Sequence, residues 1–465
     1  MDKEPGSFRD RSGCIFYNNN NLYRSVTPYY KQQYDHLIAS GLYNELVKQE
    51  LLIPHRELAP GYWPLTDASN EAIYKVLQPE KIPYLSYPYE WCFQQLKDAA
   101  LLTLNIQLKA LEYNMILKDA SAFNVQFMNG KPVFIDTLSF DHYKEGEPWV
   151  AYRQFCCHFL APLALVAHVT TGLARLSQMY IDGIPLTLAS ALLPFKTRLS
   201  AFYALHIHYH AKLETKYSGD TGASKKLKHR LSKIKLQRVI THLQSGIRSM
   251  KLLSKNSEWV NYYSEFSYTG VAIEHKKQMV KQWTSQISPK RVWDLGCNTG
   301  MFSEVVQPFS EQVISFDSDH LAIEKWYALI REKGYNNILP LVLDLNNPAP
   351  AIGWANRERK SFVERGTADL VLALALIHHL CIGNNLPLAN VAEFFSKLTE
   401  WLIIEFVPKE DKQAQRLLVT REDVFTDYNQ QNFEQAFGNF FTFEKKEQLT
   451  ETERTLYLMK SNRKD

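Results

Sequence analysis

The C-terminal half of this sequence predicts an α/β fold built on a doubly wound parallel sheet. Short apolar runs alternate there with segments long enough to be helices, a pattern typical of parallel sheets covered on both faces. The expected strands are Arg291–Leu295, Gln312–Phe316, Ile338–Leu343, Leu370–Leu374 and Trp401–Phe406. The N-terminal half has mainly helical patterns with a few short apolar runs, so we expect a mainly helical α+β domain there.

The length of the chain and one break in its composition predict two domains. A chain of 465 residues is too long for one ordinary core. Turn-forming residues cluster at 218–224, and the stretch 225–255 then carries ten Lys or Arg residues and no acid. Such a run is either the solvated face of a helix or a patch for an acidic partner such as RNA or a lipid surface. We predict an N-terminal domain over 1–214, a basic linker or helix over 215–255, and a second domain over 256–465.

The composition is that of a globular protein with reduced cysteines. Apolar residues make up 45% and charged residues 22% of the chain, which argues against disorder. The six cysteines are scattered without a CxxC pair, so we expect neither a disulfide framework nor a cysteine-based zinc site. The N-terminus is polar, unlike a signal peptide, and His158, Pro162 and His168 interrupt the longest apolar stretch. We therefore expect a cytoplasmic protein without a transmembrane segment.

Residues 292–300, Val-Trp-Asp-Leu-Gly-Cys-Asn-Thr-Gly, give the strongest functional signal in the sequence. An apolar run ends in Asp294, and Gly296 and Gly300 lie in the turn before an amphipathic segment. Glycine adopts positive φ and lets a ligand approach the backbone closely. The helix that follows would offer unpaired N–H groups. This arrangement predicts a site for a nucleotide-like cofactor.

Polar residues also end the other predicted strands of the sheet. Asp317 ends the second strand, 23 residues after Asp294, and Asp344 ends the third. Ligands of open α/β sheets lie beyond the carboxyl ends of the strands, so these acids should converge, although each could instead cap a helix. The loop lacks the second glycine of a dinucleotide motif, and an acid suits a cationic amine better than a phosphate. A nucleoside with a charged amino-acid tail, such as S-adenosylmethionine, fits these terms.

The same residues resemble the motifs of class I S-adenosylmethionine-dependent methyltransferases. The segment Asp294–Gly300 resembles their first motif, Asp317 stands at the ribose-binding acid, and residues 368–374 resemble the fourth strand. The resemblance implies a Rossmann-like fold, methyltransferase activity and S-adenosylmethionine as cofactor. It implies binding by Asp294, Gly296, Cys297, Asn298, Gly300, Asp317, Asp344 and Leu345. Asn298 replaces a glycine common in the family, and we expect the turn to survive because Asn tolerates the left-handed region.

Two adjacent histidines, His378 and His379, follow the fourth strand. Either could act as a base if the methyl acceptor must first lose a proton, or both could serve only in packing. The Asn-Pro-Pro-Tyr type of motif is absent, so we expect a small-molecule or glycan- or lipid-like acceptor and do not favour nucleic acid. Four aromatic residues could form a lid over the cofactor or the apolar face of a helix: Trp259, Tyr262, Tyr263 and Tyr268.

The N-terminal half carries a second, separate signal. Asp119 and Asn124 precede a predicted hairpin at Asn129-Gly130, and Asp136 follows it. This resembles the catalytic segment of protein-kinase-like and aminoglycoside-phosphotransferase-like folds, which implies Asp119 as base and Asn124 and Asp136 as Mg²⁺ ligands. The alternatives are a degenerate scaffold of that kind, a phosphotransferase with an accessory second domain, and a non-catalytic interaction protein.

Overall fold

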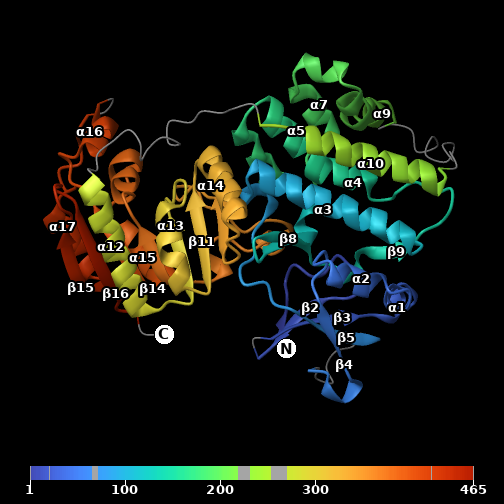
Figure 1. Cartoon of the computed structure of the whole chain (residues 1–465), viewed down its shortest axis with the longest axis horizontal. Helices are drawn as coiled ribbons and strands as arrows, with labels where there is room; N and C mark the ends of the chain where they lie inside the picture. The colour runs from blue at the N-terminus through green and yellow to red at the C-terminus, as the bar shows by residue number, and fades with distance from the viewer. Residues whose placement is uncertain are drawn as a thin grey trace. The chain divides into compact units, whose positions relative to one another are not determined.

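The computed structural model describes residues 2–19, 21–64, 72–217, 231–252, 270–419 and 422–463 (Figure 1). The chain forms two compact units, residues 1–254 with 351–359 and residues 255–350 with 360–465. The predicted break at 218–224, part of the basic stretch and the four candidate lid aromatics (Trp259, Tyr262, Tyr263 and Tyr268) lie outside the described residues.

The first unit begins with a five-stranded antiparallel sheet in the order β1-β2-β3-β5-β4. Its strands are β1 (Asp2–Lys3), β2 (Ile15–Asn18), β3 (Asn21–Val26), β4 (His55–Leu58) and β5 (Lys75–Pro79). Helices α1 (Lys31–Ala39) and α2 (Leu42–Lys48) follow β3. These strands are not expected from the sequence, because they are short and burial does not alternate along them; β3, for example, becomes buried only in its last two residues.

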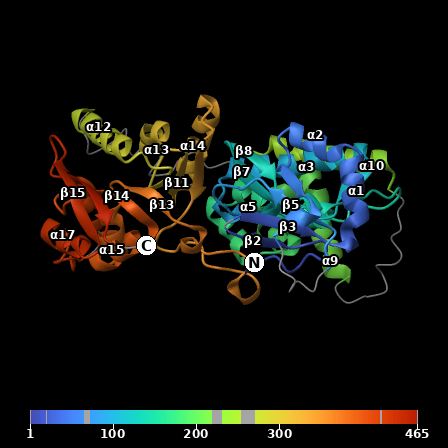
Figure 2. The same ribbon diagram turned by 90° about the horizontal axis from the view of Figure 1, so that it is seen from below.

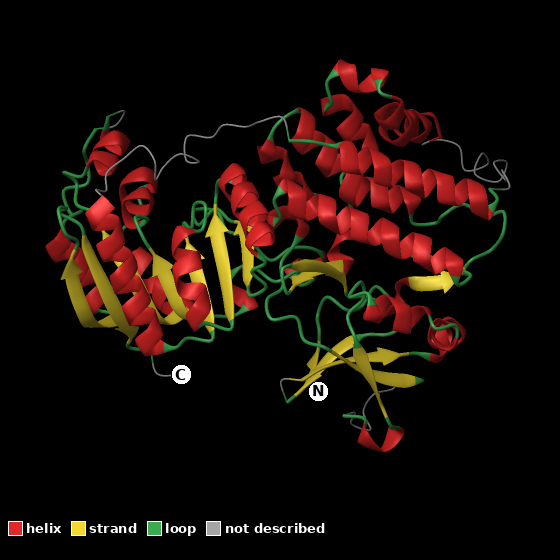
Figure 3. Ribbon diagram, viewed as in Figure 1, coloured by secondary structure: helices red, strands yellow, loops and turns green. Residues whose placement is uncertain are grey.

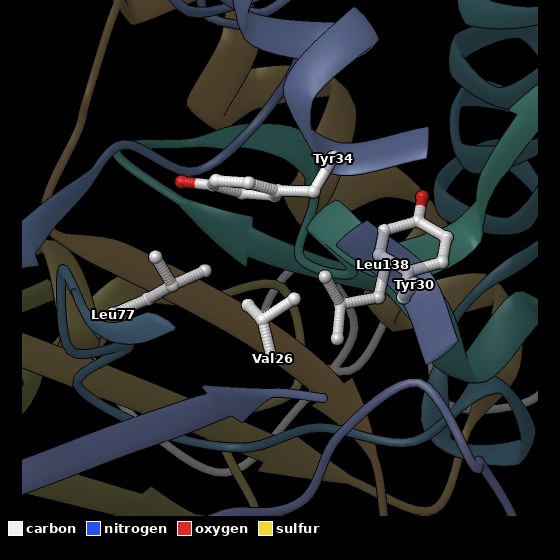
Figure 4. Close-up of a cluster of buried hydrophobic side chains, with 5 residues drawn as sticks. All are labelled: Val26, Tyr30, Tyr34, Leu77 and Leu138. Carbon is white, nitrogen blue, oxygen red and sulfur yellow. The ribbon is translucent and has the colours of Figure 1, made fainter. Parts of the chain in front are cut away.

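A cluster of buried side chains joins this sheet to Leu138, which follows the predicted hairpin at Asn129-Gly130 (Figure 4). Its members are Val26, Tyr30, Tyr34, Leu77 and Leu138. The Tyr30 hydroxyl donates to the carbonyl of Phe140 at 2.5 Å, and the Tyr34 hydroxyl donates to Glu57 at 2.7 Å. Both rings are therefore buried with their polar tips paired, which removes the cost of burying a phenol.

The predicted hairpin of the first unit is confirmed. Strands β7 (Val125–Met128) and β8 (Lys131–Phe134) pair antiparallel around Asn129 and Gly130, whose φ angles are +52° and +74°. Two positive φ angles in a two-residue loop match the twist of the strands. Helix α3 (Phe93–Glu112) precedes this hairpin in the chain. Strand β6 (Met115–Leu117) pairs antiparallel with β9 (Phe140–His142).

The rest of the first unit is helical, as its sequence pattern predicted. The helices are α4 (Tyr152–Phe155), α5 (Ala161–His168), α6 (Leu176–Met179), α7 (Leu186–Leu192), α8 (Ala201–Tyr203), α9 (His210–Tyr217) and α10 (Lys233–Ser249). Helix α5 is almost entirely buried, and none of the helices that the structure describes is long and apolar enough to cross a membrane.

Helix α10 carries the described part of the basic stretch. It packs against α3, and its buried residues Leu236, Ile240, Leu243 and Ile247 are spaced to lie on one face. The Lys97 ammonium donates to the carbonyls of Arg248 and Met250 at the end of α10. Basic side chains such as Lys235 and Arg238 remain exposed, so this stretch is an amphipathic helix within the first unit.

The second unit contains a seven-stranded sheet in the order β12-β11-β10-β13-β14-β16-β15. Its strands are β10 (Arg291–Leu295), β11 (Gln312–Asp317), β12 (Ile338–Val342), β13 (Ala368–Ala373), β14 (Thr399–Phe406), β15 (Phe441–Gln448) and β16 (Thr455–Ser461). The five predicted strands are confirmed and parallel. Strand β16, which the sequence analysis did not identify, is antiparallel to both β14 and β15.

Helices cover both faces of this sheet, as the predicted double winding requires (Figures 2 and 3). Helices α12 (Gly270–Ile287), α13 (Met301–Val306) and α14 (His320–Lys333) lie on one face, and α15 (Leu388–Leu398) and α17 (Gln430–Gly438) lie on the other. Helix α16 (Lys412–Leu418) follows β14. The winding reverses between β10 and β13, which is where open α/β sheets bind ligands.

The turn before α13 requires glycine for a reason that the sequence analysis did not foresee. Gly300 has a φ of +83°, and a Cβ atom there would lie 2.0 Å from the buried ring of Trp326. The indole N–H of Trp326 donates to Ser315 at 3.1 Å, which fixes the ring. We expected Gly300 to let a ligand approach the backbone, but the side chain of Trp326 fills the space beside it.

Replacing Gly300 with Ala should destabilise the fold more than the same change at Gly334. Gly334 also has a positive φ, +71°, but has no atom within 4 Å of an added Cβ. G334A should cost about 1–2 kcal/mol for the left-handed backbone alone. G300A should cost about 1–3 kcal/mol more because of the clash with Trp326. Urea unfolding of both variants measures the difference, and equal losses would contradict this reading of the turn.

Candidate active site

A pocket opens at the carboxyl ends of the parallel strands in the second unit. Of the residues expected to bind a cofactor, Gly296, Asn298, Asp317, Asp344 and Leu345 line it, together with His379. Asp294, Cys297, Gly300 and His378 are not among its lining residues. The pocket therefore brings together groups from three successive strand ends, and the remaining candidates lie behind its wall.

The loop between β10 and α13 shapes one side of the pocket. Gly296 has a φ of +79° and Asn298 a φ of +51°, so Asn298 does adopt the left-handed conformation that we expected it to tolerate. The N–H groups of Gly296 and Cys297 both donate to the carbonyl of Phe316, at 2.8 and 2.9 Å. These two bonds hold the loop against the end of β11. The Cys297 thiol is buried, and this burial raises its pKa well above the usual value.

Asp317 lies at the end of β11 and faces the pocket. One carboxylate oxygen accepts the N–H of Asn298 at 2.7 Å and the other accepts the N–H of Asp319 at 2.8 Å. Desolvation raises the pKa of Asp317 to about 6, while the two N–H groups oppose the shift. Helix α14 is capped by Asp319, which accepts the N–H of Leu321. Asp317 therefore remains available to a ligand as an acceptor.

Asp294 lies beneath the loop and is only 2% exposed. Its carboxylate accepts the hydroxyl of Ser303 at 2.6 Å, and Ser303 in turn contacts Ser315 at 2.7 Å. Burial raises the pKa of Asp294 to about 6, with Asp317 adding to the shift and Lys276 opposing it. The carboxylate thus adds negative potential to the pocket from behind its wall.

Asp344 follows β12 and forms a local turn. Its Oδ1 accepts the backbone N–H of Asn346 at 3.0 Å and the side-chain amide of the same residue at 3.2 Å. This is the Asx turn expected of an Asp that leaves a strand. The turn places Asp344, Leu345 and Asn346 together on the pocket wall.

The two histidines occupy different positions. His379 lines the pocket, whereas His378 is fully buried, and their rings lie 4.2 Å apart. Burial lowers the pKa of His379 to about 4 and that of His378 well below its usual value, so both are neutral at pH 7. Neither ring nitrogen of His378 has a hydrogen-bond partner within the part of the chain that is described. The structure places His379, and not His378, where it could meet a bound molecule.

A buried ion pair that the sequence analysis missed forms another part of the pocket. Lys276 of α12 lines the pocket, is 1% exposed, and donates to Glu405 of β14 at 2.5 Å. Arg454 is also fully buried; it donates twice to Asp411, at 2.8 and 2.9 Å, and lies 3.5 Å from Glu405. In the sequence, Glu405 lies within the fifth predicted strand, Trp401–Phe406, and nothing there indicates its partner. Lys276 had no signal, since one lysine in a helical pattern resembles a surface residue.

The N-terminal cluster is held by contacts within the first unit. The Asp136 carboxylate pairs with Arg24 at 2.8 Å and accepts the N–H of Leu138 and the hydroxyl of Ser139. Asp119 accepts from the N–H of Ser121 and the amide of Gln154, both within 2.9 Å, and burial with nearby Asp136 raises its pKa. The amide of Asn124 donates to Ser139. A phosphotransfer role for Asp119, Asn124 and Asp136 stays a prediction.

No protein-family model matches this sequence. The nodulation protein NoeA of Rhizobium meliloti (strain 1021) is 36% identical to it over 458 residues, which cover 97% of this chain and 94% of that protein. The chain belongs to the NoeA family. The relationship extends through both units of this chain.

Two solved structures that resemble part of this NoeA-family chain each cover less than half of it. The N-methyltransferase NodS from Bradyrhizobium japonicum WM9 is 12% identical, covers 42% of this chain and 98% of its own, and has a TM-score of 0.31. The magnesium protoporphyrin IX methyltransferase ChlM from Synechocystis PCC 6803, with bound SAM, is 16% identical, covers 44% and 90%, and has a TM-score of 0.29. Similarity at this level assigns no activity to the chain.

The Lys276–Glu405 pair predicts a stability effect. The variant K276M should destabilise the fold by about 3 kcal/mol, because it removes a buried cation that pairs with the buried carboxylate of Glu405. The double variant K276M/E405L should recover most of the loss. The control is K277M on the same helix, which removes an exposed pair with Glu274 and should cost less than about 1 kcal/mol. Chemical denaturation measures the free energy of unfolding of each variant. Equal losses in K276M and K277M would contradict a buried pair.

Proposed function

We propose that this protein is a methyltransferase that uses S-adenosylmethionine as its methyl donor. The observation that carries the proposal is the pocket at the switch point of the sheet, where Gly296, Asp317 and Asp344 from three strand ends meet. A pocket of this kind accommodates a nucleoside, and its acids disfavour a phosphate group. The same acids favour a ligand that carries positive charge.

The residues present fit the groups of this cofactor. Asp317 keeps lone pairs that could accept the ribose hydroxyls, and Gly296 leaves its backbone open to the ligand. Asp344 and Leu345 are proposed to hold the adenine, and the potential of buried Asp294 favours the cationic amino-acid tail. The cofactor supplies an electrophilic methyl group, while the protein supplies binding and alignment of the acceptor.

The histidines suggest what the acceptor requires. His379 lines the pocket and is neutral at pH 7, so its imidazole could accept a hydrogen bond or a proton from an acceptor hydroxyl or amine. Its lowered pKa makes it a weak base. His379 is therefore better suited to positioning the acceptor by a hydrogen bond than to removing a proton from a weakly acidic acceptor. His378 would act through His379, as a positioning residue. We propose a small-molecule or glycan- or lipid-like acceptor.

Cofactor binding can be tested without knowing the acceptor. Isothermal titration calorimetry should detect binding of S-adenosylmethionine and S-adenosylhomocysteine to the full chain, and D317N should weaken it about 10- to 100-fold through loss of a charged hydrogen-bond acceptor. The matched control is D369N, since Asp369 accepts the N–H of Arg291 at the opposite end of the strands. Absence of binding by the wild-type protein, or an unchanged affinity in a folded D317N variant, would refute the proposal.

The raised pKa values of Asp294 and Asp317 predict how this affinity depends on pH. Both are about 6, so each carboxyl becomes protonated as the pH falls through 6 and loses its attraction for a cationic ligand. The dissociation constant should be flat from pH 7 to 8 and rise by about tenfold per pH unit below 6 for each carboxylate that must be ionised. Calorimetry from pH 5 to 8 measures this profile. An affinity that is constant down to pH 5 would contradict a role for these acids.

A further inference from the structure

A turn in the first unit exposes several large apolar side chains to solvent. Helix α7 (Leu186–Leu192) packs against the segment 204–217, and the turn between them includes a short 3₁₀ helix, Phe195–Leu199 (Figure 1). At this turn, Phe195 is 72% exposed and Leu199 is 77% exposed. Leu192, Leu205 and Tyr209 nearby in the sequence are also exposed. Large apolar side chains gathered in one segment usually mark an interaction site.

The turn is held so that Phe195 and Leu199 point outward. His208 contacts the hydroxyl of Ser190 at 2.8 Å through Nδ1 and that of Thr197 at 2.9 Å through Nε2. The Thr197 hydroxyl donates its own proton to the carbonyl of Pro194, so it accepts from Nε2–H of a neutral imidazole. Thr197 is buried, and its neighbours Lys196 and Arg198 are exposed. His208 thus joins both arms of the turn from the inside.

The charged side chains within the turn's own segment of the sequence are all basic. Lys196 and Arg198 lie between Phe195 and Leu199 in the sequence, which contains no Asp or Glu from residue 183 to residue 213. A second copy of this chain would bring like charges together at such a surface. An anionic lipid surface meets both needs, because its headgroups attract the cations and its acyl region accepts the apolar side chains.

We propose that the turn 192–199 is a docking site for a lipid surface that contains anionic headgroups. Phe195 and Leu199 would insert below the headgroups, and Lys196 and Arg198 would remain among the phosphates, since long cationic side chains keep their charged ends at that level. The site would hold the protein at the membrane surface without spanning it. This inference is independent of the proposed methyltransferase activity.

Vesicle co-sedimentation of the full chain tests the proposal. Wild-type protein should bind vesicles of phosphatidylcholine with 30% phosphatidylglycerol and should bind pure phosphatidylcholine vesicles much less. The variant F195S/L199S should reduce the bound fraction by at least tenfold. The matched control Y62S/V150S removes an exposed aromatic and an exposed aliphatic residue elsewhere in the same unit and should bind like wild type. Circular dichroism melting should show both variants folded.

A charge-reversal variant tests whether binding to the vesicles also requires the two cationic side chains of the turn. K196E/R198E should also lose binding to the anionic vesicles, whereas K281E/K290E, with two exposed lysines in the second unit reversed, should retain it. Failure of the wild type to bind, or equal binding by wild type and F195S/L199S, would overturn the proposal. So would a wild-type dimer that F195S/L199S converts to a monomer without any vesicle binding, because the turn would then be an interface between copies.

Discussion

The parallel pairing of β10 with both β11 and β13 is the constraint on which the candidate site depends. Trp293 lies opposite Ile314 on one side and Val371 on the other, so the three strands end at the same edge. The N–H groups of Gly296 and Cys297 then reach the carbonyl of Phe316, and the loop turns across the end of β11. A shift of one residue in this register would reverse every side chain and separate Asp317 from the loop.

The second feature of the site is the amount of charge that it buries. Asp294 accepts a hydrogen bond from the hydroxyl of Ser303, and burial raises its pKa although that bond and the charge of Lys276 oppose the shift. Lys276, which lines the pocket, forms an ion pair with Glu405. The pocket therefore has acidic groups whose charge is only partly compensated and imidazoles that are neutral. This balance favours a positively charged ligand. It also lowers the free energy of unfolding of the ligand-free protein as the pH rises from 4 to 6, because these carboxyls lose their protons at a lower pH in the unfolded chain than in the folded protein.

Much of the second unit could be predicted from sequence, because buried parallel strands appear as continuous apolar runs and the acids at their ends stand out. Gly296, Asn298, Asp317 and Asp344 were found in this way. Lys276 could not be found, since its partner Glu405 lies 129 residues away and only the fold brings them together. His378 was expected in the site but is buried behind His379, because sequence order after a strand does not say which side chain faces outward. The short strands of the first unit were missed because their burial does not alternate.

The central claim is that the carboxylates at the strand ends surround a nucleoside whose tail is cationic. A crystal structure of the full chain grown with S-adenosylhomocysteine tests this most directly. The account predicts density for the ribose within hydrogen-bond distance of Asp317, with the adenine beside Asp344 and Leu345. A ligand bound elsewhere, or a pocket at the switch point that is filled by protein side chains in the crystal, would contradict it.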